Sequence, residues 1–387
     1  MSFERAKQHF LQGLAELQAG ALRDAEASFE AALALVPDRP STLINLGTVR
    51  LALGKNAEAL VLLERAAALD ASNVGVWLQC AQLQQEQQRL PEALASLEQA
   101  LALDAHNGAA WSNRGMLLRD MQRLEEAAAS FEKAIENGAD AELNAFYLAS
   151  LRAAQPNTQL GVPDVAPAVV PIFAPRSYVE KLFDSYAEDF SGHLVQALHY
   201  QGHQRLVQLL LQQLPPVSQP PNPKPFRRVL DVGCGTGLCG ALLRSHAARL
   251  DGLDLSRAMV EKARESKLYD QLFHADAVAH LQAVPAGAYD LIIAADVFNY
   301  VGALEPLFSA AHSALAAGGR FCFTVEALEP DAGDMRLLPS LRYAHSQAYL
   351  RRVATQSAWH IDGMVQAPLR EDQGVLIAAW YVVLTNN

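Results

Sequence analysis

Three glycines on alternate positions follow a short apolar run that contains one carboxylate. The run covers residues 229–232 and includes Asp231, and the glycines are Gly233, Gly235 and Gly237. The β-branched, apolar run predicts a buried strand. The leucine- and alanine-rich stretch that begins at Leu238 predicts a helix. A strand that turns on glycines into a helix exposes backbone N–H groups to a ligand at the helix N-terminus.

Two features of this turn argue against a dinucleotide ligand. The spacing is G-x-G-x-G, and Leu238 interrupts the G-x-G-x-x-G fingerprint of dinucleotide sites. Asp231, two residues before the first glycine, would repel a pyrophosphate but suits a cationic ligand with an ammonium group and a sulfonium. About 20 residues further on, Asp254 ends a second predicted strand, where an acid is placed for ribose hydroxyls.

These residues resemble the first motif of the class I S-adenosylmethionine-dependent methyltransferases. The resemblance implies that S-adenosyl-L-methionine is the cofactor and that Asp254 holds both ribose hydroxyls. It also implies that Asp276 and Ala277 meet the adenine, and that Ala295 and Asp296 lie beneath the cofactor beside the substrate. The alternative is that each aspartate caps a helix or a turn. Four acids at four successive strand ends favour the cofactor.

Residues after the fourth and fifth predicted strands are candidates for contact with the methyl acceptor. Asn299 and Tyr300 lie in a stretch that departs from the Asn/Asp-Pro-Pro-Tyr signature of enzymes that methylate amide or nucleobase nitrogens. Arg342 and Tyr343 are predicted to hold a carboxylate or phosphate by charge-assisted hydrogen bonds. His345 is a candidate general base because an unperturbed histidine titrates near neutrality. The alternative is that His345 caps a helix or is a surface histidine.

A helical stretch that begins at residue 177 precedes the glycine turn. Its Phe-Asp-Ser-Tyr-Ala segment, residues 183–187, is similar to a segment with which many class I methyltransferases fold over the cofactor. By this resemblance Tyr178 and Tyr186 cover the methionine end of the cofactor. Alternatively, both tyrosines are core aromatics of a lid helix.

These candidate residues require a sheet whose strands alternate with helices, since ligands bind outside the carboxyl ends of parallel strands. The expected strands are residues 228–232, 249–254, 271–275, 289–294, 319–325, 360–368 and 375–384. The last two are separated by a short connection and must pair antiparallel. The methyltransferase resemblance implies a Rossmann-like α/β domain with strand order 3-2-1-4-5-7-6.

The first part of the chain repeats with a period of 34 residues, which Ala25, Ala59, Ala93 and Ala127 show. This is the period of the tetratricopeptide repeat (TPR), whose consensus the residues resemble. Four repeats cover roughly residues 6 to 141, and a helix over 141–152 is expected to cap them. By family analogy the groove, which would hold a protein or peptide, is lined by Phe10, Leu14, Leu17, Ile44, Thr48, Leu51, Leu78, Gln82, Met116 and Arg119. The alternative is a module for packing or oligomerisation only.

The sequence therefore predicts two domains and a linker. Residues 1–154 form an all-α TPR solenoid, residues 155–176 a proline-rich linker, and residues 177–387 the methyltransferase domain with lid helices over 177–214.

Composition narrows the expected partners and location. The net charge of −11 makes nucleic acid an unexpected partner, because phosphate backbones bind to basic surfaces. No apolar run is long enough to predict a membrane span. The four cysteines lack metal-ligand spacing, so no metal site is predicted and reduced thiols of a cytoplasmic protein are expected.

The whole chain resembles a bacterial group of TPR-containing methyltransferases. We expect methyl transfer to a protein side chain or to a small carboxylate or hydroxyl compound, with the TPR array recruiting a partner or substrate. The rival hypothesis is a scaffold whose methyltransferase fold has lost its activity.

Overall fold

The computed structural model describes residues 2–154, 171–187, 198–214, 224–372 and 374–386. Its contacts divide the chain into two compact units, Met1–Leu151 and Arg152–Asn387. Most of the predicted linker, residues 155–170, lies outside the described residues. No helix in the described part of the chain is long and apolar enough to cross a membrane.

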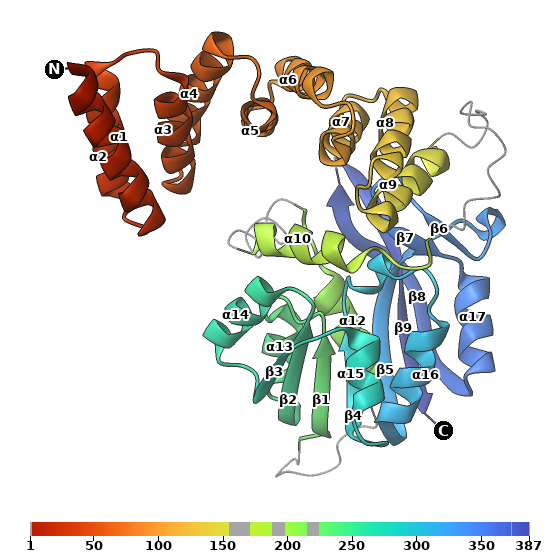
Figure 1. Cartoon of the computed structure of the whole chain (residues 1–387). Helices are drawn as coiled ribbons and strands as arrows, with labels where there is room; N and C mark the ends of the chain where they lie inside the picture. Colours follow the sequence, from red (N-terminus) through yellow and green to blue (C-terminus); the bar gives the residue numbers. More distant parts are fainter. Residues whose placement is uncertain (1, 155–170, 188–197, 215–223, 373, 387) are drawn as a thin grey trace. The chain divides into compact units, whose positions relative to one another are not determined.

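The N-terminal unit is a row of antiparallel helix pairs (Figure 1). The helices are α1 (Ser2–Gln18), α2 (Leu22–Leu35), α3 (Pro40–Ala52), α4 (Asn56–Leu69), α5 (Val74–Glu86), α6 (Leu90–Leu103), α7 (Gly108–Asp120), α8 (Leu124–Glu136) and α9 (Ala141–Ala154). Eight of them form the four predicted repeats, and α9 follows the last repeat. The all-α repeat architecture predicted for this part of the chain is confirmed.

Small residues at fixed positions let the two helices of a repeat approach closely. A Cβ atom at Gly115 would lie 2.5 Å from the Phe131 ring, and one at Gly13 would lie 2.9 Å from the Phe29 ring. Both phenylalanines are fully buried. The 34-residue period therefore records a packing requirement, in which a glycine on one helix faces a bulky side chain on the next.

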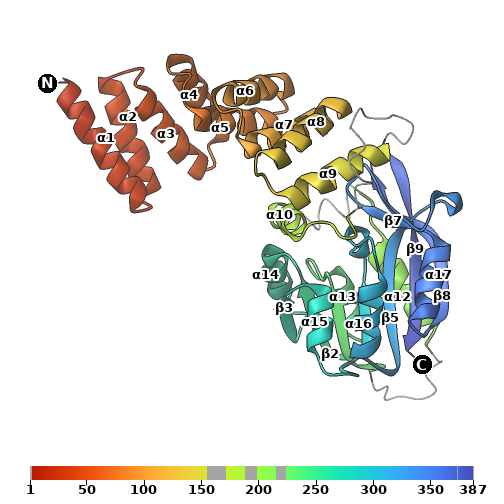
Figure 2. The same ribbon diagram turned by 45° about the vertical axis from the view of Figure 1, so that its right-hand side comes forward.

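The C-terminal unit is built on a single mixed sheet (Figures 1 and 2). Its strands are β1 (Phe226–Val232), β2 (Ala247–Asp254), β3 (Gln271–His274), β4 (Tyr289–Ala294), β5 (Leu315–Ala327), β6 (Met335–Leu337), β7 (Tyr343–His345), β8 (Trp359–Asp372) and β9 (Val375–Asn386). Strands β3, β2, β1, β4 and β5 are parallel neighbours, and antiparallel β9 lies between β5 and β8. For the seven predicted strands this is the predicted order.

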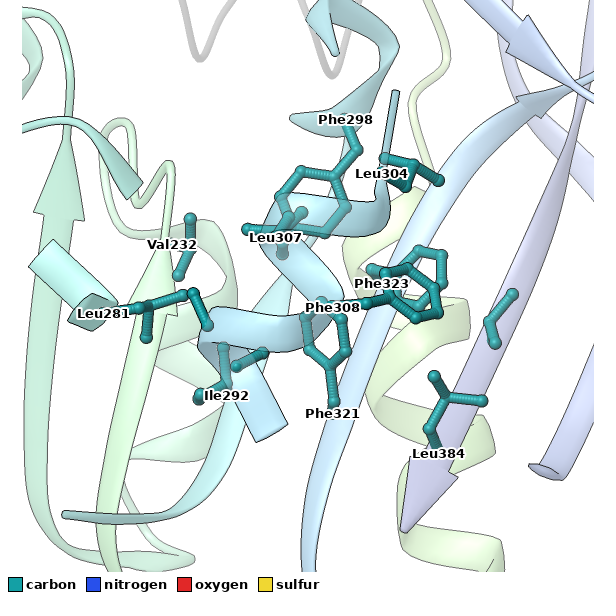
Figure 3. Packing of buried hydrophobic residues seen from close by; sticks show 14 of the residues in the cluster. Val232, Leu281, Ile292, Phe298, Leu304, Leu307, Phe308, Phe321, Phe323 and Leu384 are labelled. Carbon is teal, nitrogen blue, oxygen red and sulfur yellow. The ribbon is translucent and has the colours of Figure 1, made fainter. Parts of the chain in front are cut away.

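Helices cover both faces of the sheet. They are α10 (Arg176–Tyr186), α12 (Gly202–Gln212), α13 (Leu238–Leu243), α14 (Arg257–Ser266), α15 (Ala277–Ala283), α16 (Glu305–Ala314) and α17 (Gln347–Gln356), with 3-10 turns η2 (Phe298–Tyr300) and η3 (Pro330–Ala332). One core packs α15, α16 and α17 against the sheet and includes Phe308, Phe321 and Phe323 (Figure 3). The core on the other face packs α12 and α13 against the same strands.

The short β6–β7 hairpin was not predicted, because three-residue strands carry too little periodicity to be recognised. Glu326 of β5 pairs with Ala344 of β7 and also with Ala379 of β9. A strand residue has one neighbour on each side, so β7 and β9 flank β5 on opposite sides. Strand β4 pairs with β5 only as far as Phe323. Beyond that residue, the β6–β7 hairpin takes the place of β4 beside β5.

Candidate functional site

The glycine turn after β1 adopts backbone conformations that favour glycine. Gly233, Gly235 and Gly237 have φ of 63°, 51° and 99°. At Gly233 a Cβ atom would also lie 2.4 Å from Val297, which follows β4. Left-handed backbone and close approach therefore both exclude larger residues at Gly233. The turn leads into α13 at the carboxyl edge of the sheet, as predicted.

Asp231 is enclosed beneath this turn rather than open to a ligand. Its side chain is 1% exposed, and its Oδ2 accepts a 2.7 Å hydrogen bond from the hydroxyl of Tyr269. Burial raises the pKa of Asp231 to about 7, against the opposing effect of the Tyr269 hydrogen bond. These contacts hold Asp231 beneath the turn, and a contact of this residue with a cofactor stays a prediction.

Tyr269 is a residue that sequence reasoning missed. A Cβ atom at Gly240 would lie 2.4 Å from the Tyr269 hydroxyl oxygen, and one at Gly252 would lie 2.9 Å from the Tyr269 ring. Two glycines outside the turn thus make room for one tyrosine. Nothing local to Tyr269 indicates this role, since its partners lie on three other segments.

Asp254 fixes the glycine turn to the end of β2. Its Oδ2 accepts a hydrogen bond from the backbone N–H of Gly235 at 2.9 Å, and its Oδ1 accepts one from the N–H of Ser256 at 2.8 Å. The residue is 8% exposed, and burial raises its pKa. A carboxylate has about four acceptor positions, so two remain for hydroxyl groups of a ligand.

The third and fourth strand ends carry the other predicted acids. Asp276 is exposed and caps α15 by accepting a 2.9 Å hydrogen bond from the N–H of Ala279. This is the capping alternative considered from the sequence, and Ala277 begins the helix. Ala295 and Asp296 follow β4 and are partly exposed. A contact of these residues with a cofactor stays a prediction.

Asp296 is held in a left-handed conformation with a φ of 61°. Its N–H donates to the hydroxyl of Thr324 at 2.8 Å, and its Oδ1 accepts from the amide of Asn299 at 3.0 Å and from Nη1 of Arg370 at 2.7 Å. Non-glycine residues in this region of φ carry strain that the surroundings must offset, and such residues cluster at functional sites.

Arg370 and Glu326 join Asp296 in a buried ionic cluster that the sequence did not reveal. Arg370 is 2% exposed, and its Nη2 donates to Glu326 of β5. The pairing register of β8 shifts between Pro368 and Arg370, and such irregularities re-aim side chains. The predicted strand ended at Pro368, so Arg370 fell outside every predicted element. A proline beside a lone arginine is the one local signal of such a bulge.

Arg342 lies beside this cluster with few close partners. Its side chain is 23% exposed, its Nε lies 3.5 Å from the Tyr300 hydroxyl, and its Nη1 lies 3.6 Å from Asp372. Burial opposes the shift, but the Tyr300 hydroxyl and the carboxylates of Asp296 and Glu326 together raise the pKa of this guanidinium. The long contacts leave donors of Arg342 available for another acceptor.

Tyr343 and His345 point away from the role that the sequence assigned to them. The Tyr343 hydroxyl donates to the carbonyl of Pro171, and the ring is fully buried. His345 is likewise fully buried, and its Nε2 donates to the carbonyl of Gly302 at 2.8 Å. Burial lowers the pKa of His345 to about 4. This neutral, enclosed histidine packs β7 against the loop that follows β4, and a role of His345 as a general base stays a prediction.

Tyr178 and Tyr186 lie on α10, and both are partly buried. Helix α10 contacts α14, which follows β2 (Figure 2). Residues 188–197 of the predicted lid lie outside the described residues, while α12 at its end packs against β9, β8 and β5. Helix α10 thus lies near the carboxyl edge of the sheet. Contact of Tyr178 and Tyr186 with a cofactor stays a prediction.

Two protein families match successive parts of the chain. Residues 10–74 and 78–142 match the tetratricopeptide repeat, and residues 198–364 match a family described as a methyltransferase domain. The chain therefore carries tetratricopeptide repeats followed by a methyltransferase domain, as predicted.

Bacterial methyltransferases are among the similar proteins. The trans-aconitate 2-methyltransferase of Paracidovorax citrulli is 33% identical over 40% of this chain and 55% of its own length. The malonyl-[acyl-carrier protein] O-methyltransferase of Enterobacter lignolyticus is 29% identical over 42% of this chain and 63% of its own length. The chain thus spans less than two thirds of either relative. A solved S-adenosylmethionine dependent methyltransferase from Mesorhizobium loti is 20% identical, with a TM-score of 0.35 over 46% of this chain and 96% of its own.

The raised pKa of Asp231 predicts a pH-dependent stability. Because the folded-state pKa of about 7 exceeds the ordinary aspartate value of 3.8, the stabilising contribution of Asp231 is complete below about pH 4 and is lost as pH rises through 7. Asp231→Asn removes this titration. The free energy of unfolding of the variant, relative to wild type, should therefore rise by about 1–3 kcal/mol between pH 5 and pH 8. Urea denaturation at both pH values measures it, and a constant difference would contradict the assignment.

Proposed function

We propose that this methyltransferase with N-terminal tetratricopeptide repeats transfers a methyl group from S-adenosyl-L-methionine to a carboxylate or hydroxyl group of a small molecule or a protein. The observation that carries the proposal is the link from Asp254 to the N–H of Gly235. It brings an acid with free acceptor positions and a glycine turn together at the carboxyl edge, where ligands of such sheets bind.

The residues at this edge fit the chemistry of the proposed cofactor. Asp254 would accept hydrogen bonds from the two ribose hydroxyls while it keeps its bonds to the turn. Val297, in the loop after β4, lies where a Cβ atom at Gly233 would be, so the backbone of the turn after β1 approaches the loop after β4 closely. Asp276 and Ala277 would meet the adenine, Ala295 and Asp296 would lie beneath the cofactor, and Tyr178 and Tyr186 would cover it. When bound, the cofactor supplies an electrophilic methyl group on a sulfonium.

An ionised carboxylate is the acceptor that the described side chains suit best. A carboxylate is already deprotonated at neutral pH and needs no base, whereas a hydroxyl acceptor does. The candidate base His345 is buried with a pKa of about 4, and its Nε2–H donates a hydrogen bond to the carbonyl of Gly302. Arg342, with donors available beside Tyr300, would hold an anionic acceptor. The names of two relatives, which act on trans-aconitate and on malonyl-[acyl-carrier protein], agree with this chemistry.

The remaining residues near the acceptor would act by position and charge. Asn299 and Arg370 both donate hydrogen bonds to Oδ1 of Asp296, which would restrict rotation of its carboxylate next to the reacting groups. Methyl transfer by in-line displacement depends on such alignment of donor and acceptor. The cluster would therefore contribute by fixing the acceptor side of the site.

We further propose that the repeat array recruits the acceptor or its carrier protein, and that the protein works in the cytoplasm. Five apolar residues of the proposed groove are only partly buried, which leaves part of each available to a peptide: Phe10, Leu14, Leu17, Ile44 and Leu51. The four cysteines are buried free thiols, as in a reducing compartment. The competing function is an inactive scaffold, which would bind partners through the array without turnover.

The first test of the proposed function is cofactor binding. Calorimetry on the full chain should detect binding of S-adenosylhomocysteine and no binding of NAD. Asp254→Ala should weaken the binding by about 1–3 kcal/mol, since it leaves Gly235 and the ligand hydroxyls without an acceptor. Asp334→Ala removes a carboxylate that pairs with exposed Arg352 and serves as the control. Absence of binding by the wild type would refute the proposal.

The second test concerns recruitment. A protein of residues 152–387 keeps one compact unit intact and should bind S-adenosylhomocysteine like the full chain. With labelled cofactor and a bacterial lysate, it should methylate the native acceptor at least about 10-fold more slowly than the full chain. Its melting curve must be compared alongside, to separate recruitment from stability. Equal kcat/KM on that acceptor would instead support a packing role for the repeats.

The third test concerns the acceptor, with trans-aconitate as the first compound tried and the acceptor from the lysate as the second. Arg342→Gln should raise the KM for a carboxylate acceptor about 10-fold or more while kcat changes little, because it removes binding shared by ground and transition states. Arg336→Gln, on the exposed face of β6, is the matched control. His345→Gln should keep the pH profile of kcat. If wild-type kcat rises with pH at acidic pH and this rise is lost in His345→Gln, His345 acts as the general base.

A further inference from the structure

A hollow of about 190 Å³ lies between the start of α12 and the end of the β8–β9 hairpin. Backbone hydrogen bonds join its two sides. The N–H of Gln201 donates to the carbonyl of Leu369 at 3.2 Å, and the N–H of Glu371 donates to the carbonyl of Leu198 at 2.8 Å. Because the backbone holds the two sides together, the hollow is part of the framework of this unit.

The α12 side of the hollow carries positive charge. Arg205 and His199 both line it. Nη2 of Arg205 donates to the side-chain oxygen of Gln201 at 3.0 Å, and no described contact of Arg205 is an ion pair with a carboxylate. The N-terminus of the 11-residue helix α12 adds the positive end of its dipole on the same side. His199 has a left-handed φ of 48°, and such strained residues cluster at functional sites.

Arg370 also lines the hollow, and one of its donors lacks an acceptor. The residue is 2% exposed, and its two terminal nitrogens bond to Asp296 and Glu326. Its buried Nε has no hydrogen-bond partner among the residues that the structure describes. A buried donor that loses water without gaining an acceptor is costly, and so such groups are rare in folded proteins. An anionic oxygen in the hollow would supply a suitable acceptor.

The rest of the wall is apolar, apart from one acid. Pro368, Leu369 and Leu376 line the hollow, and Leu376 is 67% exposed. Glu371 lines it as well, and its Oε2 lies 3.2 Å from Nδ1 of His199. A carbon chain would cover the apolar wall, whereas an inorganic ion would leave it in water. Typical small-molecule pockets have about 300–1,000 Å³, so this smaller hollow suits a ligand of only a few carbon atoms.

We propose that this hollow binds a small organic anion, with its carboxylate or phosphate group at Arg205 and a short carbon chain on the apolar wall. The site is independent of the proposed function, because it requires neither the cofactor nor the methyl acceptor. Tyr300 and Arg342 are not among its described lining residues, so it differs from the proposed acceptor side. Arg370 connects the two places, since it lines the hollow and bonds to Asp296.

The test is titration of the full chain with four probes, followed by saturation-transfer NMR of the probe. The probes are acetate, butyrate, inorganic phosphate and butyl phosphate. Butyrate should bind saturably and about 10-fold more tightly than acetate, because each methylene that leaves water contributes up to about fourfold. Butyl phosphate should likewise bind more tightly than inorganic phosphate. The tighter of butyrate and butyl phosphate identifies the preferred anionic group, and either ranking supports the site.

Variants locate the bound probe. Arg205→Gln should weaken butyrate binding about 10-fold or more, because it removes charge-assisted hydrogen bonds. Arg351→Gln makes the same change at an exposed position of α17 and should leave binding unchanged. Glu371→Gln should tighten binding about threefold, since it removes a like charge from the wall. Arg342→Gln should have no effect, which separates the hollow from the proposed acceptor side.

Melting temperatures of the Arg205 and Glu371 variants should stay within about 2 °C of wild type, because neither side chain is buried. A changed affinity at unchanged stability then reports on the ligand contact itself. The proposal is wrong if none of the four probes binds saturably. It is also wrong if Arg342→Gln removes the binding while Arg205→Gln leaves it intact.

Discussion

The carboxylate of Asp254 is the point on which the candidate site depends. One oxygen binds the backbone of the glycine turn after β1, and the other binds the backbone at the start of α14. Without this carboxylate, two buried N–H groups would lose their acceptor, at a cost of about 1–3 kcal/mol each. The same loop carries Ser256, which reaches α10 through Asp184. The glycine turn, the end of β2 and α10 are therefore connected through Asp254 and its neighbour Ser256.

A second constraint acts at the ends of β4, β5 and β8, where charges are buried together. Arg370 contacts both Asp296 and Glu326. The charges of both carboxylates also contribute to the raised pKa of Arg342. Burial raises the pKa of Glu326, while the neighbouring arginine opposes the shift. A buried ion pair contributes less to stability than to fixed geometry, since desolvation offsets much of the attraction. Here the geometry that it fixes includes the left-handed backbone at Asp296.

The repeat unit follows a simpler rule, because each of its contacts is to a neighbour in the sequence. Helices pair within a repeat and pack on the next repeat, and a glycine on one helix faces Phe29, Leu63 or Phe131 on another. Such units fold from local contacts and need no long-range closure.

The sequence by itself determined the features that depend on short spacings. The 34-residue period and the glycine turn after β1 follow from patterning within one segment, and the order of the seven main strands follows from the methyltransferase resemblance. Only the tertiary structure decided which side chains meet across segments. Asp231 is bound to Tyr269, 38 residues away, and Arg370 to Asp296, 74 residues away. Tyr343 and His345 had the right types for a site, yet the three-residue strand β7 turns both into the interior. A side chain's direction depends on strand register and on a bulge or hairpin elsewhere in the sheet, and no local pattern records those.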